Sequence, residues 1–201
     1  AYKKLVSSYY NKTASTDKSN TTSTKLNSNK NAIAQKRELT EVKDAADRLY
    51  EAAGKLTDTS SSKSLFKKAD KVTNDITSAV KDYVKNYNSL IEEAADTTNS
   101  KVTGKVSFMT GQANAYKSSL EKVGITINSD KTLSIDEDTF KKSDISDVKK
   151  LFNGSGSMAY QTFVRASDIS SAAENASTSV TSYGADGMYN NYYNSAYNWY
   201  L

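Results

Sequence analysis

The carboxylates of this chain come nearest, in type and spacing, to the residues of a chemical site. An acidic run at residues 136–138 follows closely on Asp130, and oxygen ligands at such spacing can bind calcium. A calcium loop beginning at Asn128 fails, because Leu133 stands where glycine is needed and Thr139 where a bidentate glutamate is needed. The capping of helices explains these acids better, so we expect no metal site here.

Other arrangements that could do chemistry are incomplete. The pair Glu92 and Glu93 has no signal of a cleft around it, which favours a solvated helix surface. The segment 154–156 is no phosphate loop, because no strand precedes it and no Gly-Lys-Ser/Thr follows. The chain has no His and no Cys, which excludes disulfides, imidazole and thiolate metal sites, and His-activated nucleophiles. We therefore expect no enzyme, no catalytic residue and no cofactor.

Composition excludes two further classes of partner. The net charge is +4, but the basic residues are scattered among 23 acidic ones and form no block with interleaved aromatics. Nucleic-acid binding is therefore not expected. No apolar run approaches 18 residues, so no membrane span is expected either. The absence of Pro and a mean hydropathy of −0.67 favour elongated helices that bury only a stripe.

The aromatic C-terminal segment, residues 178–201, supplies the candidate partner-binding residues. They are Tyr189, Tyr192, Tyr193, Tyr197, Trp199 and Tyr200. Two interpretations remain open. The segment packs against residues 1–10, which have an apolar helical face of their own, or it forms an aromatic surface for a partner subunit or a glycan.

Apolar residues spaced by three and four predict three long helices. The first spans about 32–57, with the seam Leu39, Val42, Ala46, Leu49, Ala53 and Leu56. The second spans about 64–97, with the seam Leu65, Ala69, Val72, Ile76, Val80, Tyr83, Tyr87, Leu90 and Ala94. The third spans about 100–123, with the seam Val102, Val106, Met109, Ala113, Tyr116, Leu120 and Val123. Together they predict a mainly α fold, an elongated antiparallel bundle or coiled coil.

Three details qualify this bundle. Val84 and Ile91 widen the stripe of the second helix on one side, which indicates more than one neighbour. Gly104 and Gly111 weaken the third helix, whose first turns either fray or approach a partner closely. Beyond residue 135, Asp136 and Asp144 are predicted to cap short helices, and residues 158–177 form a further helix with a small-residue face.

The chain divides by composition into three parts. Residues 1–31 combine a short helix with a segment, 11–31, of mostly Ser, Thr, Asn and Lys, which predicts flexibility. Residues 32–177 form the helical bundle. Residues 178–201 form the Tyr-rich segment.

Residues 125–135 are the one place where the apolar period changes to two, which predicts a β-hairpin. Gly124 stands where a left-handed residue ends the preceding helix. If Ile125 pairs with Ile135, and Ile127 with Leu133, the loop is residues 129–131. The last residue of such a loop needs a positive φ and is usually Gly. Here it is Lys131.

Two stretches resemble the bacterial flagellar filament-cap family, hook-associated protein 2. Residues 80–90 (Val-Lys-Asp-Tyr-Val-Lys-Asn-Tyr-Asn-Ser-Leu) are similar to a Phe/Tyr-Val-x-x-Tyr-Asn-x-Leu pattern of that family. Residues 120–127, 130–137 and 148–152 resemble its Leu-x-x-Ile-Gly-Ile, Asp-Gly-x-Leu-x-Leu-Asp and Val-x-x-Leu-Phe in order and spacing. The likeness covers roughly residues 65–155. Lys131 replaces the usual Gly, and the chain lacks a large β-rich domain.

The resemblance implies a secreted structural protein that assembles at the tip of the bacterial flagellum. Its implied partners are copies of itself or flagellin-like subunits, and some such proteins contribute to cell adhesion. One alternative is a cell-surface binding module that uses the Tyr-rich termini for a glycan or a protein. Another is a cytoplasmic helical chaperone for flagellar export.

Replacing Lys131 by Gly should stabilise the chain by about 1 kcal/mol, because glycine adopts a positive φ without steric strain. Thermal unfolding followed by circular dichroism should show a higher melting temperature for Lys131→Gly. An unchanged or lower melting temperature would count against this register.

Overall fold

The computed structural model describes residues 2–59 and 64–182, with the side chains of residues 30–59 and 64–180. In this part of the chain, helices dominate and the strands β1 (Ile125–Ile127) and β2 (Leu133–Ile135) form one antiparallel hairpin. The prediction of a mainly α fold with one small hairpin is confirmed. Within the described ranges, no helix carries an apolar stretch long enough to cross a lipid bilayer.

The chain divides into two compact units. One comprises residues 1–37 and 177–201, and its described parts are helical. The other comprises residues 38–176 and contains the hydrophobic core and the hairpin. Every buried apolar side chain among the described residues belongs to this second unit, so hydrophobic burial stabilises this part of the chain.

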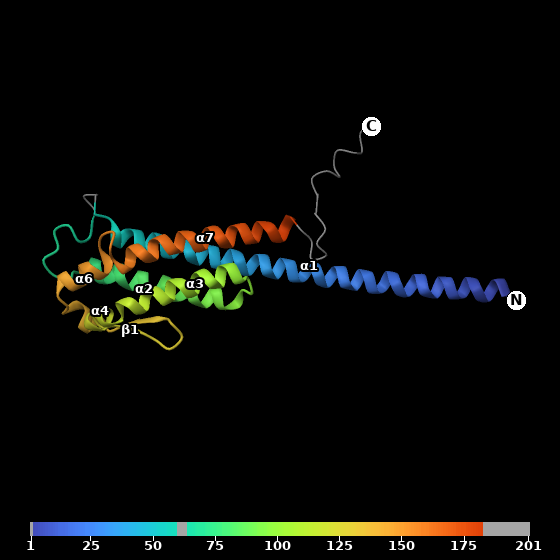
Figure 1. Ribbon diagram of the computed structural model, residues 1–201, viewed down its shortest axis with the longest axis horizontal. Coiled ribbons are helices and arrows are strands. Elements are labelled where there is room, and N and C mark those ends of the chain that lie inside the picture. The colour runs from blue at the N-terminus through green and yellow to red at the C-terminus, as the bar shows by residue number, and fades with distance from the viewer. Residues whose placement is uncertain (1, 60–63, 183–201) are drawn as a thin grey trace, which may run out of the picture. The chain divides into compact units, whose positions relative to one another are not determined.

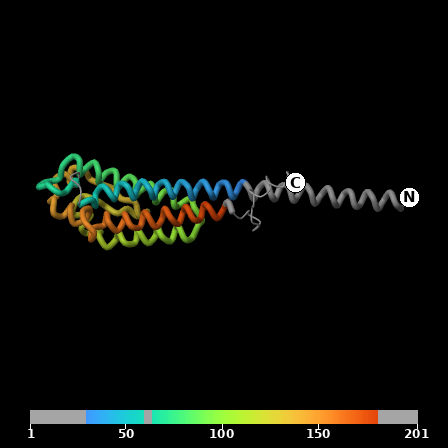
Figure 2. The backbone as a smooth tube through the Cα atoms, turned by 90° about the horizontal axis from the view of Figure 1, so that it is seen from above, coloured from blue at the N-terminus to red at the C-terminus, as the bar shows by residue number. Residues whose placement is uncertain are grey.

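The second unit is an antiparallel helical bundle. Its long helices are α1 (Tyr2–Thr57) from residue 38 onward, α2 (Asn74–Asp96), α3 (Ser100–Ala113) and α7 (Met158–Ser182) up to residue 176. Each runs opposite to the long helix before it in the chain (Figure 1), and the second view shows the same side-by-side packing (Figure 2). The shorter elements are the 3-10 turn η1 (Asn114–Tyr116), α4 (Lys117–Lys122), α5 (Glu137–Lys141) and α6 (Ile145–Phe152).

The predicted seams of the first and third helices form much of the core. All six seam residues of α1 are at most 2% exposed. On α3 and α4 every seam residue is buried except Tyr116, which is half-buried. These positions exclude water because residues three and four apart share one helix face.

The first long helix begins earlier in the structure than the sequence predicts. Residues 11–31, predicted to be flexible, belong to α1. No Pro or Gly occurs before Gly54, so no residue with a strong helix-breaking tendency interrupts this helix. The prediction that residues 1–10 pack with residues 178–201 concerns side chains outside the described part.

The second predicted helix begins ten residues later than expected, at Asn74. The hydroxyl of Thr73 accepts a hydrogen bond from the Ile76 backbone N–H (3.2 Å), so Thr73 is the N-cap. Residues 64–73 therefore form a turn-rich connection instead of helix, and its buried anchor is Phe66 rather than the predicted Leu65. Lys149 on α6 holds this connection by donating to the Ala69 carbonyl (2.9 Å).

The third predicted helix is interrupted and the last is longer than predicted. The 3-10 turn η1 separates α3 from α4, although the apolar seam continues through it to Leu120 and Val123. Helix α7 runs to Ser182 instead of residue 177, because Gly184 is the first glycine after its start.

Edge-to-face aromatic contacts join α2, α5 and α6 inside the bundle. The ring of Phe152 lies 5.7 Å from that of Tyr83 at 76° and 6.4 Å from that of Phe140 at 72°. The Tyr83 hydroxyl forms a 2.8 Å hydrogen bond with the Thr162 hydroxyl of α7. Burial raises the pKa of Tyr83, so this phenol stays neutral.

The hairpin has the predicted register. Ile125 pairs with Ile135 and Ile127 with Leu133, and the Asn128 N–H donates to the Thr132 carbonyl (2.8 Å) to close the loop. Lys131 has a φ of +73°, the left-handed value that this loop requires. Ile125 and Leu133 are buried, so the hairpin adds one face to the core.

The two acidic caps are also confirmed. The Asp136 carboxylate accepts from the backbone N–H groups of Asp138 and Thr139 at 3.1 Å each, at the start of α5. The Asp144 carboxylate accepts from the Ser146 N–H at 2.7 Å, at the start of α6. Their position at helix N-termini accounts for the acids without a metal ion.

Substitution of Gly124 by Ala should destabilise the protein by about 2–4 kcal/mol. Its φ is +76°, and a Cβ there would lie 2.9 Å from the Thr139 Cβ and 3.1 Å from the Asp136 carbonyl oxygen. Gly154→Ala is the matched control, because its φ is +85° but no atom lies within 4 Å of its Cβ. Urea unfolding should show the larger loss for Gly124→Ala, and equal losses would show that the close contact has no effect.

Candidate partner-binding groove between α2 and α3

A pair of hydrogen bonds from α2 holds the hairpin in place. The side-chain amide of Asn88 donates to the Leu133 carbonyl (2.8 Å), and its oxygen accepts from the Leu133 N–H (2.7 Å). Asn88 thus satisfies both main-chain groups of a residue on the free edge of β2. Because unpaired edge groups are costly when shielded from water, this amide does for Leu133 what a third strand would do.

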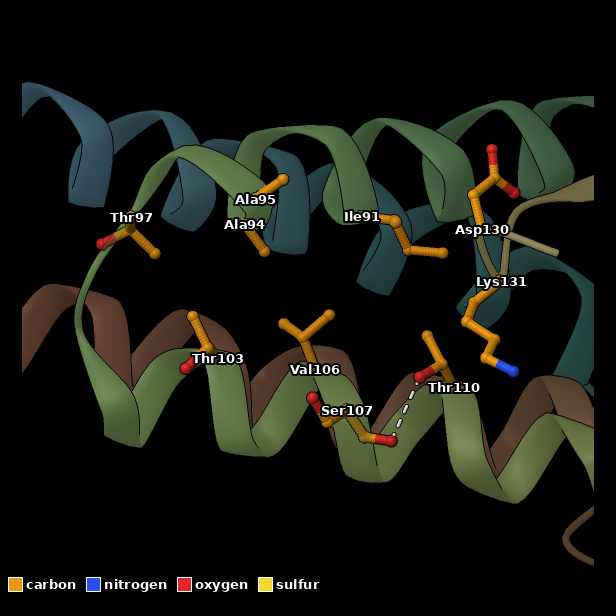
Figure 3. A pocket seen from close by; sticks show the side chains of 10 residues that line it. All are labelled: Ile91, Ala94, Ala95, Thr97, Thr103, Val106, Ser107, Thr110, Asp130 and Lys131. Carbon is orange, nitrogen blue, oxygen red and sulfur yellow. Dashed lines mark hydrogen bonds between the residues drawn. The ribbon is translucent and has the colours of Figure 1, made fainter.

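The hairpin tip, α2 and α3 together line a groove with a volume of about 330 Å³. Its lining residues are Ile91, Ala94, Ala95 and Thr97 from α2 and its C-cap, Thr103, Val106, Ser107 and Thr110 from α3, and Asp130 and Lys131 from the hairpin loop. Figure 3 shows Ala94 of α2 and Val106 of α3 pointing toward one another across this space.

The groove exists because the facing side chains are small. Ala94 and Ala95 on α2 stand opposite Val106 and Ser107 on α3, so the surface between the two helices is not filled (Figure 3). Aliphatic groups make up most of the α2 wall, and hydroxyls most of the α3 wall. Such a mixed lining offers a ligand both apolar contact and hydrogen bonding.

The hairpin loop supplies both charges of the lining. The Asp130 carboxylate accepts hydrogen bonds from the Thr132 hydroxyl (2.6 Å) and the Thr132 N–H (3.0 Å), and these lower the pKa of Asp130. Figure 3 shows the Lys131 side chain extending toward α3, whereas the Asp130 carboxylate points the opposite way. Among the described residues the Lys131 ammonium has no hydrogen bond and no ion pair, so it is available to an external anion.

Two exposed glycines lie on the α3 side of the groove. Gly104 and Gly111 are two helical turns apart and therefore share a face, with the groove-lining Ser107 between them. A Cβ at either position would meet no atom within 4 Å. The helix is intact across both, so the predicted fraying is not observed in the backbone, and the alternative of close approach to a partner remains a prediction.

A second exposed apolar surface, the α7 strip, consists of Tyr160, Phe163 and Val164 with Tyr50 of α1 and Phe108 of α3. The ring of Phe163 stacks on Tyr50 at 4.2 Å and lies 6.2 Å from Tyr160. The Arg165 guanidinium lies 4.8 Å from the centre of the Phe108 ring and pairs with Asp168 at 3.3 Å. The strip is therefore mostly aromatic, and the charges of Arg165 and Asp168 beside it offset each other.

The residues proposed from sequence as partner contacts lie elsewhere. Tyr189, Tyr192, Tyr193, Tyr197, Trp199 and Tyr200 fall outside the described residues, so the structure neither supports nor contradicts their role. In the described ranges, no three His, Cys, Asp or Glu side chains gather as metal ligands. The groove was not predicted. The signals that could have indicated it are Ile91 on the widened stripe and the paired glycines of α3.

Comparisons with protein-family models, with curated proteins and with solved structures found no match to this chain.

Removing the Asn88 amide should destabilise the protein by about 1–3 kcal/mol, because Asn88→Ala leaves the Leu133 N–H and carbonyl without their partner. Asn86→Ala on the same helix is the control, since the Asn86 amide donates only to the exposed Asp82 carbonyl. Chemical denaturation of the three proteins measures the difference. Similar stabilities for the two variants would mean that the Asn88 contact does not hold the hairpin.

Proposed function

We propose that this chain is a non-enzymatic, secreted structural protein of the flagellar filament-cap type. It works outside the cell, on a bacterial flagellum or at the cell surface. It acts by helix packing and by association with its own copies or with flagellin-like subunits.

The observation that carries the proposal is a direct contact between the two stretches on which the resemblance rests. Asn88 belongs to the Tyr-Asn-x-Leu part of the first stretch, and its amide binds both main-chain groups of Leu133 in the second. Tyr83 of the first stretch also packs edge-on against Phe152 of the last. A set of motifs that meet in one core is a stronger similarity than motifs that only share an order in the sequence, because the residue types then serve one another.

The α7 strip supports a role in assembly. In the described part of the chain the exposed large apolar side chains are Ile33, Tyr50, Phe108, Tyr160 and Val164. All except Ile33 belong to the strip. Exposed large apolar side chains of this kind favour contact with another protein.

Light scattering across the micromolar range should therefore show an oligomer whose mass rises with concentration. The double variant Tyr160→Ser, Val164→Ser should shift this equilibrium toward the monomer, because it removes two apolar side chains from the strip. Ile33→Ser, which changes a residue that is 70% exposed and outside the strip, is the control.

A wild-type chain that stays monomeric at every concentration, and that also fails to cosediment with flagellin filaments, would contradict the proposed function. Oligomers that persist unchanged in the double variant would place the assembly surface elsewhere on the chain.

A further inference from the structure

We propose that the groove between α2 and α3 binds an acidic amphipathic helix of a partner protein. The helix places apolar side chains between α2 and α3, and one of its carboxylates meets the ammonium of Lys131. This inference goes beyond the assembly role and does not depend on the flagellar resemblance.

The charge of the groove specifies an acidic occupant. Lys131 and Asp130 are the charged residues of the lining, and Asp130 is engaged by two hydrogen bonds from Thr132. The Asp130 carboxylate also points away from α3, whereas the Lys131 side chain extends along the groove toward it (Figure 3). Helix α3 itself contains no acidic residue. An incoming carboxylate therefore finds an unpaired cation and no competing anion on the α3 wall.

The size and lining of the groove suit a helix. The lining covers residues 91–97 along α2 and 103–110 along α3, which is about 10 Å or two helical turns. An amphipathic helix fills such a space with side chains at i, i+3 or i+4 and i+7. The hydroxyls of Thr97, Thr103 and Ser107 interrupt the aliphatic surface. They suit polar side chains at the edge of a peptide better than an uninterrupted hydrocarbon chain.

The glycines of α3 leave room for the backbone of another helix to come close. Gly104 and Gly111 present bare backbone beside Ser107, and no atom of the described chain occupies the space where their side chains would be. A glycine inside a helix is less stable than alanine, and packing against the described residues gives no reason for either one. Close approach of another backbone along this face gives a reason for both.

A second copy of this chain is a poorer occupant. Two copies related by a twofold axis present the same face to each other. Docked through this face, they would bring two like linings together, each with Lys131 as its one cation. Lys131 has no ion pair among the described residues that would offset its repulsion from the second copy.

The test is a selection from a phage-displayed library of 14-residue helical peptides with randomised surface positions, carried out on the full chain. Selected peptides should carry Asp or Glu one turn from an apolar i, i+3, i+4 cluster. Their affinity, measured by fluorescence anisotropy, should fall roughly tenfold for Lys131→Gln, which removes the charge but keeps a long polar side chain. Ala95→Arg should abolish binding, because it fills the groove from an exposed position.

Lys105→Gln is the matched control. It removes an exposed charge from α3 that does not line the groove, and it should leave the affinity unchanged. Circular dichroism and the melting temperature of each variant verify that all three are folded.

The proposal is overturned if no peptide is enriched, if enriched peptides lack acidic residues, or if they bind Lys131→Gln as tightly as the wild type. It is also overturned if Ala95→Arg converts an oligomeric wild type to a monomer in light scattering, since the groove would then hold a second copy of the chain.

Discussion

Two hydrogen bonds between Asn88 and Leu133 hold the hairpin on the bundle. A two-stranded hairpin is marginally stable in water by itself, because half of its main-chain groups have no partner strand. Here an amide side chain of α2 pairs with both groups of one edge residue, at 2.7 and 2.8 Å. A helix can provide such a contact only through a side chain whose donor and acceptor are on separate neighbouring atoms, and Asn is the shortest residue with this arrangement.

The hairpin that this contact holds contributes to both the hydrophobic core and the groove. Buried Ile125 and Leu133 complete the core, while the loop that ends at Lys131 lies at the end of the groove. The base of the hairpin is fixed as well, because the Asp136 N–H donates to the Gly124 carbonyl at 2.8 Å. Hydrogen bonds thus hold both the base and the edge of the hairpin that carries Lys131 to the groove.

Much of this arrangement could be predicted from the sequence, because alternating Ile and Leu residues around a short polar loop allow one register, and apolar seams define the buried helix faces. The start of α2 could not. Leu65, Ala69 and Val72 continue the helical spacing toward the N-terminus, but Thr73 is the N-cap, so the helix begins only after them. The groove was missed for a different reason. Small residues such as Ala95 and Ser107 leave no periodic signal, and Asn88 reads in sequence as an ordinary polar position on a helix surface.

At three positions, the residue is not the one that would stabilise the local backbone most. Where the backbone of the described residues has a positive φ, Gly124 and Gly154 are glycines, but Lys131 is not. Within α3, Gly104 and Gly111 take places where alanine would stabilise the helix without touching any neighbour. Selection for stability alone would favour glycine at 131 and alanine at 104 and 111, a difference on the order of 2–3 kcal/mol. Lys131 lines the groove, and the two glycines follow its lining residues Thr103 and Thr110 along α3, so we expect a constraint other than folding to act on this part of the surface.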